Sequence, residues 1–228
     1  MNWEEIYIAL PKLLDGALLT LELVILACVA GFLIAVPVAL MRSSRNWWLR
    51  NIPLVYTFFF RGTPMLVQLF LLYYGAAQFE AVRESFFWPV LREAYWCALI
   101  VFALNTGAYT AEIFRGAIRT VPEGEIEAGI AIGMKKPTLY RRVVLPRAIR
   151  MALPSYGNEI IFMIKGSALA YTITLLDLTG VTRTIIARNY LAIEMYFAAG
   201  VIYLLITFVF IQVWMRVEKR MLRFQTPH

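Results

Sequence analysis

Five long apolar runs constrain the fold of this chain more than any other feature of its sequence. A helix that spans a membrane needs roughly 20 mainly apolar residues. The runs are Leu14–Met41, Pro64–Gln78, Tyr95–Phe114, Leu153–Leu176 and Tyr196–Trp214. The run from Pro64 is short, and a helix of full length there would extend back through Val55–Phe60. The fourth run contains Asn158, Glu159 and Lys165 and is the weakest of the five by hydropathy.

The composition also indicates a membrane protein. Hydrophobic residues make up 61% of the 228-residue chain, against about half of a typical soluble domain. No internal repeat or low-complexity tract divides the sequence. We therefore expect an all-α integral membrane protein with five transmembrane helices in a single domain over residues 1–228. The N-terminus is acidic and the first run is too long for a signal-peptide core, so no cleavable signal is expected.

Lys and Arg cluster in alternate connections between the runs, which is how charge orients a membrane protein. One cluster follows the first run, one lies between the third and fourth, and one closes the chain: Arg42, Arg45, Arg50 and Arg61; Arg115, Arg119, Lys135, Lys136, Arg141, Arg142, Arg147 and Arg150; Arg216, Lys219, Arg220 and Arg223. The other connections are sparse or balanced in charge. Five spans, with the N-terminus outside and the C-terminus inside, satisfy this pattern. The net charge of +7 therefore indicates membrane orientation and not nucleic-acid binding.

The residues that usually carry catalysis are scarce. Cys28 and Cys97 lie in apolar segments without a C-x-x-C spacing, so buried thiols that pack as small hydrophobes are expected. The single histidine, His228, excludes a multi-histidine metal site. The sequence has no G-x-x-x-x-G-K-[ST] loop to hold nucleotide phosphates. We therefore expect no enzymatic activity, no metal and no cofactor in this chain.

A basic loop over residues 115–150 connects the third and fourth runs. Pro122 and the acidic residues that follow it are typical of a helix N-terminus, and Gly133 is a stop signal. Pro137 is expected to open a second short helix that ends at Pro146. The pattern predicts a helix–turn–helix at the inner membrane face. Composition alone slightly favours a hairpin that only rests on lipid headgroups.

The order of residues within this loop points to a more specific role. Glu127, Ala128 and Gly129 are followed by Gly133, then by Val143 and by Leu145-Pro146. This order resembles the E-A-A–x3–G–x9–I-x-L-P signature of bacterial ABC importer permeases, with Gly129 and Val143 as mild departures. The segments FRGTPMLVQ, LNTGAYTAEIFRGAI, LPSYGNEI and KGSALA also resemble the polar amino acid uptake family. Within it the chain is most similar to M-type subunits of histidine/lysine/arginine/ornithine and opine transporters.

The resemblance covers nearly the whole chain and implies the type I ABC importer fold. It implies a permease subunit in the bacterial inner membrane that imports polar, more specifically basic, amino acids or opines by alternating access. The implied partners are a second homologous permease chain, a dimeric ATP-binding subunit inside and a periplasmic substrate-binding protein. Glu127–Gly133 would be the coupling helix that docks on the ATPase, with Leu145 and Pro146 completing the motif.

Polar residues within the third run are candidates for the translocation path. Asn105, Tyr109 and Glu112 are spaced i, i+4 and i+7 and share one helical face. An intramembrane carboxylate is costly unless it faces a partner or a wet cavity. Two alternatives stay open at this point, because hydrogen bonds between helices or an ion pair of Glu112 with Arg115 would serve a structural purpose. For the flanking Thr106 and Thr110 the structural role is favoured.

The second and fourth runs supply the remaining candidates: Gln68, Asn158, Glu159 and Ser167. Glu159 is the best candidate to meet substrate charge, because a cationic group in a low-dielectric cavity needs a nearby anion. Lys165 more simply holds carbonyls or an acid on a neighbouring helix.

Arg61-Gly62-Thr63-Pro64 reads as a break between two helices, with Pro64 at the first position of the second. Arg61 is expected at the inner headgroups or against a partner subunit. The physical role of the motif as a whole stays open.

A stand-alone secondary carrier or channel is the alternative function. Many carriers contain inverted repeats or a duplicated half, and this sequence contains neither. Purification would separate the two, because a carrier would transport without an ATPase.

Overall fold

The structure is a computed structural model that describes residues 2–44 and 46–222, and over these residues it is helical with no strand. Three residues named above lie outside the described residues: Arg45 and Arg223 of the basic clusters, and the single histidine, His228. Three helices are each long and apolar enough to cross a membrane: α1 (Trp3–Arg42), α6 (Ala94–Arg119) and α11 (Ala192–Leu222).

Two further candidate spans are bent pairs of helices. The first joins α2 (Trp47–Gly62) to α3 (Met65–Phe70) and its π-helical continuation Leu71–Gly75, with a bend of 104°. The second runs from α8 (Lys136–Leu139) through a π-helical turn (Tyr140–Val144), α9 (Leu145–Gly166) and a 3-10 helix (Ser167–Ile173), and then bends by 49° into α10 (Leu178–Asn189). Only if each pair counts as one span does the total reach the predicted five. The predicted extension through Val55–Phe60 is thus part of α2, which meets α3 at a steep angle.

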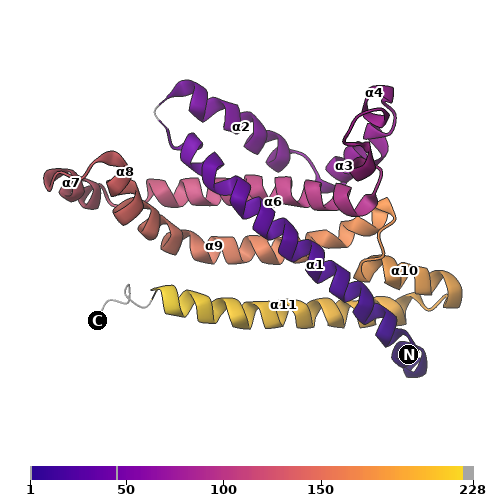
Figure 1. Cartoon of the computed structure of the whole chain (residues 1–228). Helices are drawn as coiled ribbons and strands as arrows, with labels where there is room; N and C mark the ends of the chain where they lie inside the picture. The colour runs from indigo at the N-terminus through magenta and orange to yellow at the C-terminus, as the bar shows by residue number, and fades with distance from the viewer. Residues whose placement is uncertain (1, 45, 223–228) are drawn as a thin grey trace.

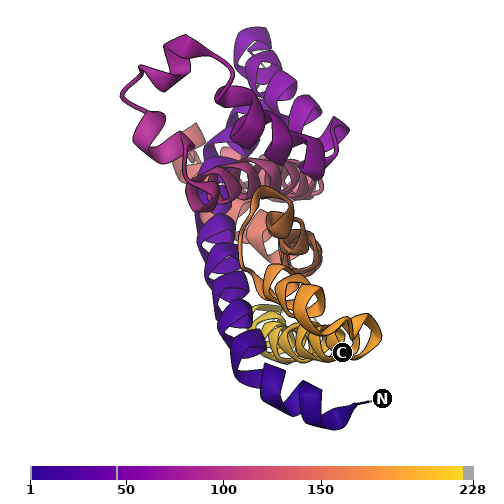
Figure 2. The ribbon, with the colours of Figure 1, turned by 90° about the vertical axis from the view of Figure 1, so that its right-hand side faces the viewer.

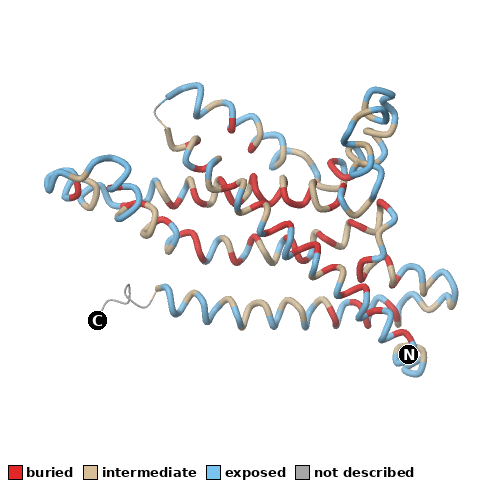
Figure 3. The backbone as a smooth tube through the Cα atoms, in the orientation of Figure 1, coloured by how far each residue is buried: buried red, intermediate tan, exposed pale blue. Residues whose placement is uncertain are grey.

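Helix α6 is the centre of the bundle. In Figure 1, α1 crosses in front of α6 and α9, α2 lies above and α11 below. Figure 3 shows buried residues along α6, whereas most of α11 is exposed or intermediate. The crossing of α1 and α6 is close, because a Cβ built on Gly31 would lie 3.0 Å from the backbone nitrogen of Gly107. Small residues at such crossings let membrane helices approach each other.

Three groups of buried side chains hold the helices together. The central group includes Leu23, Phe102 and Met163 from α1, α6 and α9, and it contains both cysteines as free thiols, which confirms their predicted burial. A second group joins α1 to α10 and α11, and a third packs the ends of α6 and α9 around Leu139. Each of the three groups includes side chains of α1, so this helix contacts all of them.

The basic loop departs from its prediction in one respect. Helix α7 (Glu123–Ala131) ends in a turn where Gly133 has φ +79°, so the predicted stop is confirmed. The prediction that Pro146 ends a second helix is wrong, because the chain continues helically through Pro146 into α9. In an α-helix a proline ring conflicts with the carbonyl of residue i−4. The π-helical turn just before Pro146 widens the coil and accommodates the ring.

Candidate functional site

The break between α2 and α3 is held by side chains that bind its backbone carbonyls. Helix α2 ends at Gly62, and Pro64 has the extended conformation that starts α3. The last turn of a helix leaves carbonyls without helical donors. The Nε2 of Gln68 donates to the carbonyls of Phe60 (3.0 Å) and Thr63 (3.1 Å). Gln68 thus satisfies the end of the preceding helix from within α3.

Two residues of α6 complete this arrangement. The Nδ2 of Asn105 donates to the Phe60 carbonyl and to the Oε1 of Gln68, both at 3.0 Å. The hydroxyl of Tyr109 donates to the Arg61 carbonyl at 3.3 Å. The polar face predicted on the third run therefore meets the break, and hydrogen bonding between helices is one of its roles.

A cavity of about 600 Å³ opens beside the break. Its walls come from three elements: the α2–α3 break, α6 and α9, through Arg61, Gly62, Thr63, Pro64, Met65, Asn105, Tyr109, Glu159, Phe162 and Met163. Such a wall, largely apolar with a few placed polar groups, is typical of small-molecule sites. The buried carboxylate of Glu159 and the half-exposed guanidinium of Arg61 give the cavity one charge of each sign.

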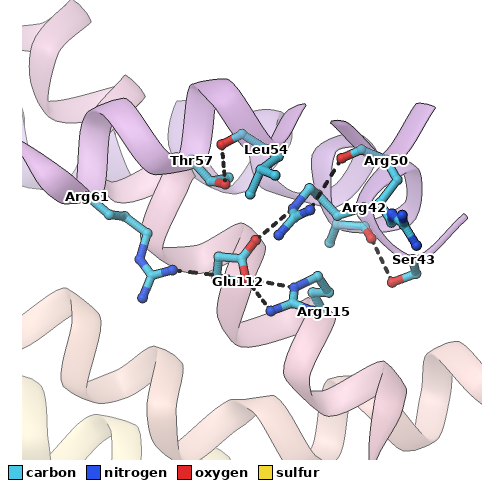
Figure 4. Close-up of polar contacts among 9 residues, drawn as sticks. Arg42, Ser43, Arg50, Leu54, Thr57, Arg61, Glu112 and Arg115 are labelled. Carbon is cyan, nitrogen blue, oxygen red and sulfur yellow. Dashed lines mark hydrogen bonds and ion pairs between the residues drawn. The ribbon is translucent and has the colours of Figure 1, made fainter. Parts of the chain in front are cut away.

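Glu112 does not line this cavity and is instead surrounded by arginines (Figure 4). Its Oε1 accepts from the Nε of Arg42 at 3.0 Å, and its Oε2 lies 2.6 Å from the Nη2 of Arg115. The Nη1 of Arg61 lies 3.9 Å from the same Oε2. The ion pair with Arg115, one of the alternatives left open above, is therefore the arrangement found. The contacts of Glu112 with Arg42 and Arg61 also tie α6 to the ends of α1 and α2.

Arg61 was expected at the inner headgroups or against a partner subunit, and that expectation stays a prediction. Its guanidinium lies 5.3 Å from the centre of the Tyr109 ring and lines the cavity. Glu112, a carboxylate within an apolar run and close to Arg115, was the sequence signal for this cluster of charges. Nothing in the sequence identified Arg42 and Arg61 as further partners of Glu112.

The other predicted path residues do not line the cavity. Gln68 is buried behind the break, and Ser167 is buried with its hydroxyl donating to the Ile164 carbonyl at 2.8 Å. Asn158 is exposed on α9 beside Glu159. The Lys165 ammonium lies 5.9 Å from the centre of the Phe162 ring. Thr106 and Thr110 are buried, and their hydroxyl groups have no hydrogen-bond partner among the described residues.

The α7 region forms a second site at the end of the bundle. Glu127 and Ala128 are exposed, as are Ile130 and Ile132, whereas Gly129 is buried. A Cβ at Gly129 would collide with Leu139, so a residue without a side chain lets α7 pack closely there. The Glu125 carboxylate lies 3.6 Å from the Nε of Arg147 and links α7 to α9. Leu145 and Pro146 are partly buried in the first turn of α9.

Comparisons with known proteins agree with one another. A family model described as "Binding-protein-dependent transport system inner membrane component" matches residues 27–223. The chain is 50% identical to the octopine transport system permease protein OccM of Rhizobium radiobacter over 197 residues, which is 86% of this chain and 80% of that protein. It is 42% identical to the histidine/lysine/arginine/ornithine transport system permease protein HisM of Escherichia coli K12, over 93% of this chain and 90% of that protein.

A solved structure agrees with these relatives. The crystal structure of an amino acid ABC transporter with histidines superimposes with a TM-score of 0.86 and 32% sequence identity. The match covers 96% of this chain and 99% of that one.

Proposed function

The chain belongs to the family of binding-protein-dependent transport system inner membrane components, and we propose that the molecules it carries are basic amino acids or opines. It is the permease of an ABC importer in the inner membrane. The relatives at 42% and 50% identity are permeases for histidine, lysine, arginine and ornithine and for octopine. Basic amino acids and opines share a cationic head.

The observation that carries this proposal is the pair of opposite charges in one cavity. Glu159 provides an anion for a cationic side chain, and Arg61 provides a planar guanidinium suited to a carboxylate. Both lie beside apolar walls from Phe162 and Met163. In a low-dielectric cavity, charge complementarity of this kind acts strongly on a ligand. A basic amino acid or an opine can place its cationic side chain against Glu159 and a carboxylate against Arg61.

The positions of the helix ends support the proposed orientation and coupling. Figure 1 places α7 and the described end of α11 at one end of the bundle, and the start of α1, α4 and α10 at the other. With the N-terminus outside, the exposed face of α7 (Glu127, Ala128 and Ile130) meets the ATP-binding subunit in the cytoplasm. Leu145 and Pro146 then pass its movement into α9, whose residues line the cavity.

The importer is completed by its other subunits. Membership of the family implies an ATPase and a binding protein, and we propose that the second permease is a homologous but different chain. ATP binding moves the coupling helices, and the cavity then changes the side to which it opens. Substrate can favour one of the two conformations of the importer only if it binds that conformation with higher affinity than the other.

The test replaces the cavity carboxylate in the complete importer. Glu159→Gln keeps the size of the side chain and removes its charge. In proteoliposomes with saturating, loaded binding protein, arginine uptake should fall at least about tenfold, which corresponds to losing one charge-assisted contact of about 1.4 kcal/mol or more. Citrulline has no cationic side chain, so its uptake should change much less if the binding protein delivers it.

The matched control is Glu93→Gln, which removes an exposed carboxylate that lies outside both the cavity and α7. Normal arginine uptake with Glu159→Gln would exclude the charge-recognition role. Uptake by the chain alone, with no ATPase present, would favour the carrier alternative.

A further inference from the structure

The connection between the π-helical end of the second span and α6 carries unusually exposed aromatic side chains. This aromatic loop, residues 79–93, contains the short helices α4 (Glu80–Arg83) and α5 (Trp88–Leu91). Phe79 is 64% exposed, Phe86 92% and Phe87 66%. The rings of Phe86 and Phe87 are neighbours, with centres 5.9 Å apart. Leaving such apolar surface in water is unfavourable.

The loop lies beside the bundle and not on top of it. Figure 2 looks onto the end of the molecule where α10 lies, and the loop projects there sideways from the helices, towards the upper left. Trp96 on the first turn of α6 and Leu18 and Ile25 on α1 are exposed apolar residues as well. These two helices are long and apolar enough to span the membrane. Because the loop leads directly into α6, it lies near the depth at which this span leaves the bilayer, and it projects away from the bundle there.

The charges of the loop are mixed and nearly balanced. Its members are Glu80, Arg83, Glu84, Arg92 and Glu93. Arg92 and Glu93 lie 3.5 Å apart, so they neutralise each other locally. No strongly charged protein surface or anionic headgroup is complementary to such a segment. Aromatic side chains favour the boundary between headgroups and acyl chains. There the rings leave water while the charged groups of the loop stay hydrated.

We propose that the aromatic loop is a membrane anchor whose Phe86 and Phe87 insert into the bilayer interface at the end of the bundle opposite α7. The anchor would hold the start of α6 and the α3 end of the second span at a fixed depth. Because apolar transfer and not charge drives the insertion, it is independent of salt and of anionic lipid. The proposal rests on the membrane location of the chain and not on which molecule it transports.

The test measures the depth of a spin label in the assembled importer. Phe86→Cys carries a nitroxide, and Glu84→Cys, an exposed site two residues away, carries the same label as the matched control. Both native cysteines are buried and should react little. Collision rates with oxygen, which concentrates in lipid, and with a water-soluble nickel chelate are then compared in nanodiscs of phosphatidylcholine. The oxygen-to-nickel ratio should be several-fold higher at residue 86 than at residue 84.

The same measurement distinguishes the other possible contacts of the loop. The ratio should stay constant when phosphatidylglycerol or salt is added, and when loaded binding protein is added. A Phe86 label that is open to the nickel chelate until binding protein arrives would overturn the proposal in favour of a docking site. A label that neither reagent reaches would also overturn it, because the loop would then be buried against the second permease chain.

Discussion

Glu112 is a single carboxylate that three arginines share, so each partner depends on it. Arg42 and Arg115 are within 3.0 Å of it, and Arg61 is within 3.9 Å. Its side chain is only 10% exposed. Removing one member of a buried ion pair leaves uncompensated charge and costs far more than the net stabilisation that the pair provides. The cluster therefore joins α1, α2 and α6 through one residue.

Glu112→Gln should destabilise the permease by about 3 kcal/mol, because the arginines would lose their shared anion. The expected readout is a lower melting temperature of the detergent-solubilised complex, followed by tryptophan fluorescence. Glu93→Gln is the control, because Glu93 forms an exposed pair with Arg92, and exposed pairs contribute at most about 1 kcal/mol. Equal melting temperatures for the two variants would contradict the role given to Glu112.

Gly133 sets the turn after α7 through its backbone and not through its contacts. Its φ is +79°, and a Cβ there would have no neighbour within 4 Å. Gly133→Ala should therefore cost about 1–2 kcal/mol of conformational strain without a steric clash. We expect this change to misplace α7 and to lower ATPase stimulation by loaded binding protein while the complex stays assembled.

Asparagine tolerates the left-handed conformation better than alanine does. Gly133→Asn should therefore retain more of the ATPase stimulation, measured as phosphate release in proteoliposomes. If Ala and Asn behave alike, the conformation of the turn does not control coupling.

At the scale of elements, the α2–α3 break shows how far the sequence could be read. Pro64 and Gly62 predicted a break at the right place. The spacing of Asn105 and Tyr109 predicted that they share a face. Neither pattern could indicate that this face binds the carbonyls at the end of α2, because those contacts join residues 45 and 48 positions apart. Pairing over such separations is set by how helices pack and not by local pattern.

At Pro146 the prediction from a local rule was wrong, because the rule has an exception that applies here. Proline normally ends an α-helix, and this rule predicted the end of a short helix. The preceding π-helical turn removes the conflict, so the helix continues from Lys136 to Ile173. The widened turn has no sequence signature comparable to the proline itself. Glu159, by contrast, was predicted as a path candidate from its charge in an apolar run, and it lines the cavity.

The hydrogen bonds of Gln68 should make the break depend on this one amide. Gln68→Met preserves length and volume but removes the donor to the Phe60 and Thr63 carbonyls. The Thr63 carbonyl would lose its side-chain donor and the Phe60 carbonyl would keep only Asn105, which costs about 2 kcal/mol. We expect a lower melting temperature and reduced arginine uptake, because the break forms one wall of the cavity.

Gln78→Met is the matched control for this change. Gln78 is exposed and only donates to the Tyr74 carbonyl at 3.5 Å. Its replacement should change stability by no more than about 0.5 kcal/mol. Similar losses in both variants would show that the amide at position 68 does not hold the break.

At the scale of the whole molecule, hydropathy and charge carry different information. Hydropathy located all five apolar runs, yet two of them are bent pairs whose angles no hydropathy pattern could predict. The charge pattern predicted orientation, and the structure groups α7 and the described end of α11 away from the start of α1 (Figure 1). That grouping agrees with an odd number of spans. Which end faces the cytoplasm still depends on charge alone.

Labelling of single cysteines tests the orientation directly. Lys12 and Lys219 are exposed near opposite ends of the bundle, on α1 and α11. Cys28 and Cys97 are buried, so they should give little background with a membrane-impermeant maleimide. Because basic clusters remain inside, Lys12→Cys should react in spheroplasts with an intact inner membrane. Lys219→Cys should react only after that membrane is opened. The reverse order would place α7 outside and would remove the coupling role proposed for it, since ATP is available only on the cytoplasmic side.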